Sequence, residues 1–131
     1  METKRLELGR EQLQKIGGVG GEEVIESLHG VAPDVGKYII EFAFGDIYSR
    51  GELSLKEREM ITITSLLTTG GCEPQLEVHI NGALNVGMSP KKIIETFIQC
   101  IPYVGFPKVL IAISIAKKIF SERGIVQYEE T

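Results

Sequence analysis

The sequence predicts an all-α protein, a single-domain bundle of about six or seven helices. Apolar residues recur with the 3.6-residue period of a helix, and alternation with a period of two never extends beyond three or four residues. Glycine and proline stand where the periodic segments end, as helix boundaries require. With 131 residues, of which 43% are apolar, the chain can bury one substantial core.

Composition and charge argue against several classes of protein. The net charge is −4 and no basic cluster is present, which argues against nucleic-acid binding. The longest apolar run, residues 109–113, is too short to span a bilayer. The N-terminus is charged and lacks the apolar segment of a signal peptide, so we expect a cytoplasmic protein with no membrane contact. The two cysteines, 28 positions apart, do not form a secreted disulfide framework and should both be thiols.

The N-terminal part is expected to be a helical extension. Residues 1–16 predict a polar helix with a thin apolar stripe, and residues 22–28 allow two further helical turns. Four glycines within residues 17–21 are interpreted as a flexible connector between them. A phosphate-binding loop is disfavoured here, because no strand precedes the glycines and no Gly-Lys-Ser/Thr follows.

Two helices are expected next. Pro33 suits the first turn of a helix that fades near Ser49. Ser54 and Glu57 have the spacing of a capping box, which opens a second helix that reaches about Thr69. The predicted apolar face of the first of these helices consists of Val35, Tyr38, Ile39, Phe42 and Ala43.

The following short helix carries the residues with the most chemistry. Gly71 and Gly87 bound it, and Pro74 suits its first turn. His79 should lie in the middle of this helix, and Cys72 in the loop that leads into it.

Two apolar helices complete the prediction. Ser89 is an expected N-cap, and residues 101–107, with two prolines and a glycine, should interrupt the helical pattern. The last helix, from Pro107 to about Gly124, is apolar over most of its circumference, so we expect it to form a subunit interface. Residues 128–131 are interpreted as a frayed tail.

Several segments together resemble the carboxymuconolactone decarboxylase family, which also includes the AhpD-type alkylhydroperoxidases. The resemblance extends from Ala32 to Ser121. It is carried by the segment Phe44–Gly51, Arg58-Glu59, Leu76-x-x-His79, the segment Gly82–Ser89, Glu95 and the segment Pro102–Pro107. It implies an AhpD-like all-helical protomer that assembles into a homo-oligomer, a trimer or a hexamer. We accordingly divide the chain into an extension with its Gly-rich connector (1–30), a carboxymuconolactone decarboxylase-like domain (31–123) and a C-terminal tail (124–131).

The decarboxylase branch of this family implies acid–base chemistry on a small carboxylated or lactone substrate. Such a lyase needs no cofactor, and His79 and Glu59 would move the proton and stabilise the enolate-like charge. In a tight hairpin, however, the residue level with His79 would be Thr64, with Glu59 ~7 Å further along the helix. Further pocket candidates are Thr64 itself, Gln75 and Tyr103.

The peroxidase branch implies an alternative, a thiol-dependent antioxidant enzyme of peroxiredoxin type. Cys72 matches the first thiol of its Cys-x-x-Cys-x-x-x-His motif and His79 the histidine, but Gln75 stands in place of the second thiol. Cys100 could resolve a sulfenic acid at Cys72 only if the fold brought the two together.

A non-catalytic oligomeric binding protein is the second alternative. No metal is expected, because Cys72, Glu77 and His79 lack the ligand count of a closed zinc site.

Overall fold

The computed structural model describes residues 2–126, and every regular element among them is helical. This confirms the all-α prediction, while the tail expected at residues 128–131 lies outside the described residues. The elements are α1 (Lys4–Glu26), α2 (Pro33–Tyr38), the π-helix η1 (Ile39–Ile47), α3 (Leu55–Thr69), α4 (Glu73–Asn85), α5 (Pro90–Val104) and α6 (Phe106–Glu122).

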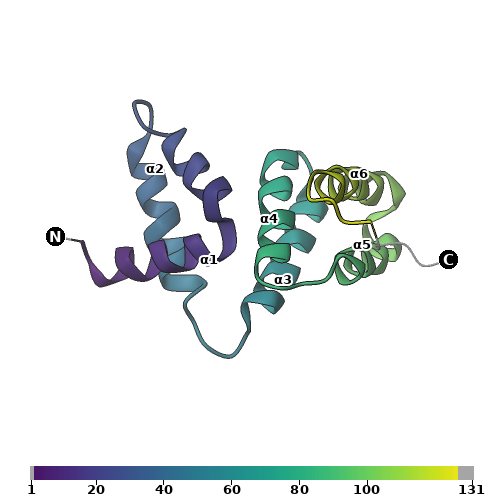
Figure 1. Cartoon of the computed structure of the whole chain (residues 1–131), viewed down its shortest axis with the longest axis horizontal. Helices are drawn as coiled ribbons and strands as arrows, with labels where there is room; N and C mark the ends of the chain where they lie inside the picture. Colours follow the sequence, from purple (N-terminus) through teal and green to yellow (C-terminus); the bar gives the residue numbers. More distant parts are fainter. Residues whose placement is uncertain (1, 127–131) are drawn as a thin grey trace.

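The helices form three layers. In Figure 1, α3 and α4 stand in the middle, α5 and α6 pack on one side of them, and α1, α2 and η1 lie on the other. The loop between η1 and α3 connects the N-terminal layer to the rest of the molecule. Within residues 2–126, no helix combines the length and the hydropathy that are needed to cross a bilayer.

Local capping chemistry sets most helix boundaries where the sequence predicts them. Ser54 Oγ accepts from Glu57 N–H at 3.1 Å, and the Glu57 carboxylate accepts from Ser54 N–H at 2.8 Å, so the capping box that opens α3 is complete. Ser89 caps α5 in the same way, by accepting from Lys92 N–H. Gly105, with φ of 89°, ends α5 and precedes α6 directly.

Residues 101–107 interrupt the helical pattern as expected, because Gly105 separates α5 from α6. Pro102 itself lies within α5, where a proline near the C-terminal end leaves most of the helix's hydrogen bonds intact. One local expectation is wrong. The glycine run does not form a flexible connector. It is a kink at Gly18 (φ 51°, ψ −133°) within α1, where the chain changes direction in Figure 1.

The π-helical winding of η1 changes which apolar side chains face the core. Tyr48 N–H donates to the carbonyl of Ala43, five residues back, at 2.9 Å. Ile40 and Phe44 are buried, whereas Tyr38 and Phe42 of the predicted face are about 60% exposed. Ile39 and Ala43 of that face do pack against the core. A pattern spaced for α-helical turns therefore assigns the buried stripe only in part.

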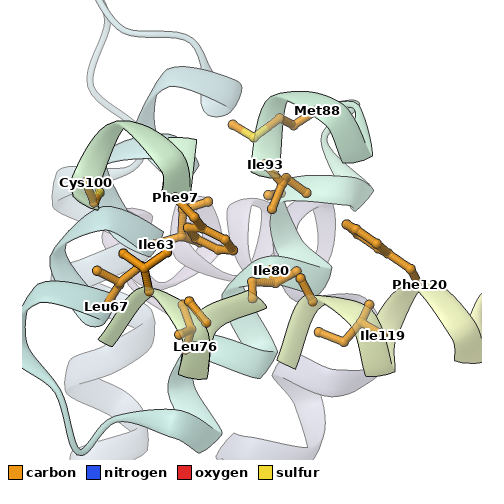
Figure 2. Close-up of a cluster of buried hydrophobic side chains, with 14 residues drawn as sticks. Ile63, Leu67, Leu76, Ile80, Met88, Ile93, Phe97, Cys100, Ile119 and Phe120 are labelled. Atoms are coloured by element: carbon orange, nitrogen blue, oxygen red, sulfur yellow. The ribbon is translucent and has the colours of Figure 1, made fainter. Parts of the chain in front are cut away.

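The core consists of two clusters on opposite sides of the middle layer. Figure 2 shows the larger, in which apolar side chains from α3, α4, α5 and α6 converge, including Ile63, Ile80 and Phe97. The smaller joins α1 to η1 through Leu13, Ile16, Ile40 and Phe44. The candidate site described below is lined by residues from both sides of the boundary between these clusters, in α1, η1, α3 and α4.

The backbones of α1 and η1 touch where they cross. A Cβ on Gly9 would overlap the carbonyl oxygen of Ile40, and a Cβ on Gly45 would overlap that of Arg5. Beside this crossing, the Arg5 guanidinium binds both carboxylate oxygens of Asp46 at 3.0 and 2.9 Å. Two glycines thus let α1 lie directly on η1.

The last helix buries one face and exposes another. Val109, Ala112, Ala116, Ile119 and Phe120 are fully buried in the larger cluster, while Leu110 is 60% and Ile111 45% exposed. Assembly through this exposed face stays a prediction.

Candidate active site

Glu59 and His79 form a buried pair between α3 and α4. Nδ1 of His79 lies 3.0 Å from Oε2 and 3.3 Å from Oε1 of Glu59. The Glu59 side chain is 0% exposed, and that of His79 is 19% exposed. The expectation that Thr64 lies level with His79 is therefore wrong. Residues 70–72 connect the two helices, with positive φ at Gly70 and Gly71.

The contact with Glu59 orients the imidazole of His79. A carboxylate buried this completely must be paired, and His79 Nδ1 is the partner within hydrogen-bond distance of both its oxygens. With Glu59 ionised, Nδ1 is the protonated ring nitrogen and donates a hydrogen bond to the carboxylate. Nε2 of His79 is then left to accept or donate a proton in the cavity that His79 lines.

Gly82 makes room for this pair. It follows His79 by three residues, so it lies on the same face of α4. A Cβ at Gly82 would lie 3.2 Å from Oε2 of Glu59 and 2.8 Å from Cγ2 of Ile16. The absent side chain thus allows Glu59 to reach α4 and α1 to pack closely over it.

Two hydroxyl groups complete the polar cluster. The Tyr48 hydroxyl lies 2.7 Å from Oγ1 of Thr62, which donates to the carbonyl of Arg58 at 2.8 Å. Burial raises the pKa of Tyr48, and the negative charge of Glu59 raises it further. Tyr48 therefore remains a hydroxyl, able to donate a hydrogen bond, across the pH range in which proteins are stable.

Sequence reasoning selected Thr64 rather than Thr62 as the pocket threonine and did not single out Tyr48, although both left a signal. Thr62 follows Glu59 by three residues and so shares its helical face, whereas Thr64 follows by five and does not. Tyr48 belongs to the Phe44–Gly51 segment that carries the family resemblance.

A cavity of about 460 Å³, here called the His79 cavity, opens beside the polar cluster. Its polar lining comes from Tyr48, Thr62, Gln75 and His79. The remaining lining residues are apolar or glycine: Leu13, Gly21, Val24, Ile25, Ile39, Ala43, Phe44, Pro74 and Val78. No lysine, arginine, aspartate or glutamate is among the described residues that line it.

The other candidates from the sequence lie elsewhere. Cys72 lines a separate cavity of about 160 Å³, the Cys72 cavity, and its Sγ donates to the Gly70 carbonyl at 3.3 Å. Tyr103 is 80% exposed, and neither it nor the half-buried Thr64 lines either cavity. Cys100 is 8% exposed in the larger core cluster, and both cysteines are free thiols.

Comparison with known proteins assigns the chain to a family. A profile described as "Carboxymuconolactone decarboxylase family" matches residues 33–118. The chain belongs to the carboxymuconolactone decarboxylase family. The matched segment includes the site residues Tyr48, Glu59, Thr62, Gln75 and His79. The residues of α1 that line the His79 cavity lie before this segment.

Individual relatives of this chain cover most of its length. A 4-carboxymuconolactone decarboxylase of Acinetobacter baylyi is 31% identical over 77% of this chain and 75% of the relative. An uncharacterized 15.0 kDa protein of Paracoccus denitrificans is 28% identical over 75% of this chain and 74% of its own. A nitrosuccinic acid decarboxylase of Metarhizium robertsii is 26% identical over 79% and 74%, respectively.

Among residues 2–126, no three His, Cys, Asp or Glu side chains gather in a way that could hold a metal ion.

The raised pKa of Tyr48 predicts a loss of stability in alkaline solution. In the unfolded chain a tyrosine ionises near pH 10, whereas Tyr48 in the folded protein keeps its proton to higher pH. Above about pH 10 the unfolded state therefore binds fewer protons, and the free energy of unfolding falls by up to about 1.4 kcal/mol per pH unit on account of this group. Tyr48→Phe should remove this part of the slope.

Urea unfolding at pH 9, 10 and 11 measures the effect. Tyr38→Phe, which removes a hydroxyl from a residue that is 62% exposed, is the control and should keep the wild-type slope. Equal slopes in Tyr48→Phe and Tyr38→Phe would contradict the assignment.

Proposed function

We propose that the protein is a decarboxylase that acts on a small carboxylated or lactone substrate by general acid–base catalysis, without a bound cofactor. The observation that carries the proposal is the buried Glu59–His79 pair at the His79 cavity. Glu59 orients the imidazole, and Nε2 of His79 exchanges the proton with the substrate. Two of the three relatives described above bear decarboxylase names, which supports the same reaction class.

The reaction needs an electron sink in the substrate and a proton donor in the protein. The bond between the carboxylate carbon and its neighbour breaks, CO₂ leaves, and the electron pair moves onto a conjugated carbonyl oxygen as an enolate. The Gln75 amide is a neutral donor in the cavity that would stabilise this oxygen, and the Tyr48 hydroxyl would do so by turning its O–H away from Thr62. The enolate carbon then takes a proton from Nε2 of protonated His79, so each turnover consumes one proton from solvent.

The apolar wall of the His79 cavity favours loss of CO₂. A carboxylate that lies against this wall exchanges water for a lining in which nine residues are apolar or glycine, and among the described lining residues only His79, when protonated, could offset its charge. The charge spreads out as the carboxylate becomes neutral CO₂ and an enolate that accepts hydrogen bonds. The cavity therefore stabilises the transition state more than the bound acid.

Direct measurement of CO₂ tests the proposal. The full-length protein is incubated with β-keto acids and with carboxylated lactones, each labelled at the carboxylate, and the released label is counted. We expect catalysed release from at least one member of this panel. Saturable binding of panel members with no release from any of them would favour the non-catalytic binding protein instead.

The position of Cys72 distinguishes this proposal from a thiol peroxidase. Cys72 is half-buried at the N-cap of α4 and lines a cavity other than that of His79, while Cys100 is buried. Cys72 should therefore react with iodoacetamide at least tenfold faster than Cys100, because the probe must reach the thiol. Cys72→Ser should leave CO₂ release unchanged within about twofold.

Peptide mass mapping after timed alkylation measures the two rates, and Cys100→Ser is the matched control variant. Turnover of alkyl hydroperoxide should be poor, since Gln75 occupies the place of a resolving thiol. Efficient peroxide turnover with a dithiol reductant that is lost in Cys72→Ser would favour the thiol peroxidase over the decarboxylase.

A further inference from the structure

The His79 cavity has two chemically different parts. Tyr48, Thr62 and His79 gather around the Glu59 carboxylate, and Gln75 lies one helical turn before His79 on the same face of α4. The wall that α1 contributes is entirely apolar or glycine and consists of Leu13, Gly21, Val24 and Ile25. A ligand that places its reacting end at His79 therefore lays its remainder against hydrocarbon.

The described cations around this cavity lie outside it. At its polar end, Arg58 shares a smaller pocket with Tyr48 and Thr62, and its guanidinium donates to the carbonyls of Arg50 and Gly51 at 3.0 and 2.8 Å. Val24 and Val78 line both the His79 cavity and an open cleft between α1, α4 and the end of α6, in which Lys15 and Arg123 lie. Lys15 is paired with Glu11 at 3.4 Å, and Arg123 donates to the side-chain oxygens of two asparagines of α4 at 2.9 and 2.8 Å. Lys15 and Arg123 are thus held by their own partners beyond the wall that the two valines form.

A second carboxylate at the α1 end of the ligand would find no lysine or arginine among the described residues that line the His79 cavity. Burying such a charge without a partner is costly, whereas burying methylene groups there is favourable. The volume of about 460 Å³ lies within the range of cavities that enclose small organic ligands.

We propose that the substrate is a monocarboxylic acid whose carboxylate and carbonyl lie at His79, and whose uncharged apolar remainder lies against α1. The proposal rests on the decarboxylase function given above and identifies its substrate class. It also makes α1 the element that determines specificity, since this wall precedes the segment that the family profile matches.

Binding of unreactive acids tests the inference independently of catalysis. Calorimetric titration of the full-length protein compares butanoate, hexanoate and octanoate with the dicarboxylates of equal length. Affinity for the monocarboxylates should rise with chain length, by up to roughly tenfold for each two methylenes added. Octanedioate should bind at least tenfold more weakly than octanoate, and its monomethyl ester, which lacks the second charge, should recover most of that loss.

Two variant pairs locate the effect at α1. Val24→Arg places a cation at the wall and should narrow the preference for octanoate over octanedioate at least tenfold. Val19→Arg is its control, because Val19 is 74% exposed and lines only the open cleft. Gly21→Leu should abolish the rise in affinity with chain length, because its Cβ would lie 2.8 Å from Leu13 Cδ1. Gly20→Leu is its control and should retain that rise, because a Cβ at this position has no atom within 4 Å.

The outcomes separate this inference from the proposed function. Equal or tighter binding of the dicarboxylates, no dependence on chain length, or no binding of any acid would overturn the substrate class, even if CO₂ release were found. The expected binding pattern without CO₂ release from any labelled acid would leave the cavity's ligand class intact and refute the decarboxylase.

Discussion

Replacing His79 with alanine is expected to lower kcat for CO₂ release by about 10²- to 10⁴-fold, because the reaction loses its proton donor. Glu59→Gln should give an intermediate loss, since a neutral amide can still contact Nδ1 but no longer stabilises the protonated imidazole. His29→Ala, which removes the exposed second histidine, should retain wild-type kcat.

A stability measurement separates catalysis from folding in these variants. His79→Ala leaves the fully buried Glu59 carboxylate without its partner and should cost up to about 3 kcal/mol of unfolding free energy. The double variant His79→Ala/Glu59→Gln removes the unpaired charge, so it should regain stability without regaining activity. A His79→Ala protein that keeps more than a tenth of wild-type kcat would exclude His79 as the proton donor.

Replacing Gly9 with alanine is expected to destabilise the protein by about 3 kcal/mol or more, because overpacking against backbone cannot be relieved by a rotamer change. The new Cβ would overlap the Ile40 carbonyl oxygen and approach Ile40 Cγ2 to 2.9 Å. The N-terminal half of α1 must then move away from η1. Such a loss is a large part of the roughly 5–15 kcal/mol that holds a typical domain folded.

The matched control lies in the same helix. Gly20→Ala adds a methyl group with no atom within 4 Å and should be neutral or stabilise by up to about 1 kcal/mol, because alanine favours helix. Urea titration of both variants gives the two free energies of unfolding. If they differ by less than about 0.5 kcal/mol, the glycine contact between α1 and η1 does not contribute as described.

Local chemistry made much of the fold predictable. The capping box of Ser54 and Glu57 and the N-cap of Ser89 are satisfied by groups three residues away, so they need no tertiary context. For the same reason Pro33, Gly70 and Gly87 stand at or next to the ends of helices. The all-α class and the family both followed from such local patterns.

The sequence by itself determined most helix boundaries, the family and the identity of His79, Glu59 and Gln75 as candidates. Only the tertiary structure decided that Glu59 reaches His79, because the placement of α4 against α3 depends on packing between the two helices.

Tertiary packing also decided the rest of the site. It brought Tyr48 to Thr62 beside the Glu59–His79 pair and placed Cys72 in another cavity. The kink at Gly18 made part of the N-terminal extension into a cavity wall. Helix ends depend on hydrogen bonds within a few residues, whereas the register between helices depends on loop geometry and on contacts between distant segments, which local patterns do not specify.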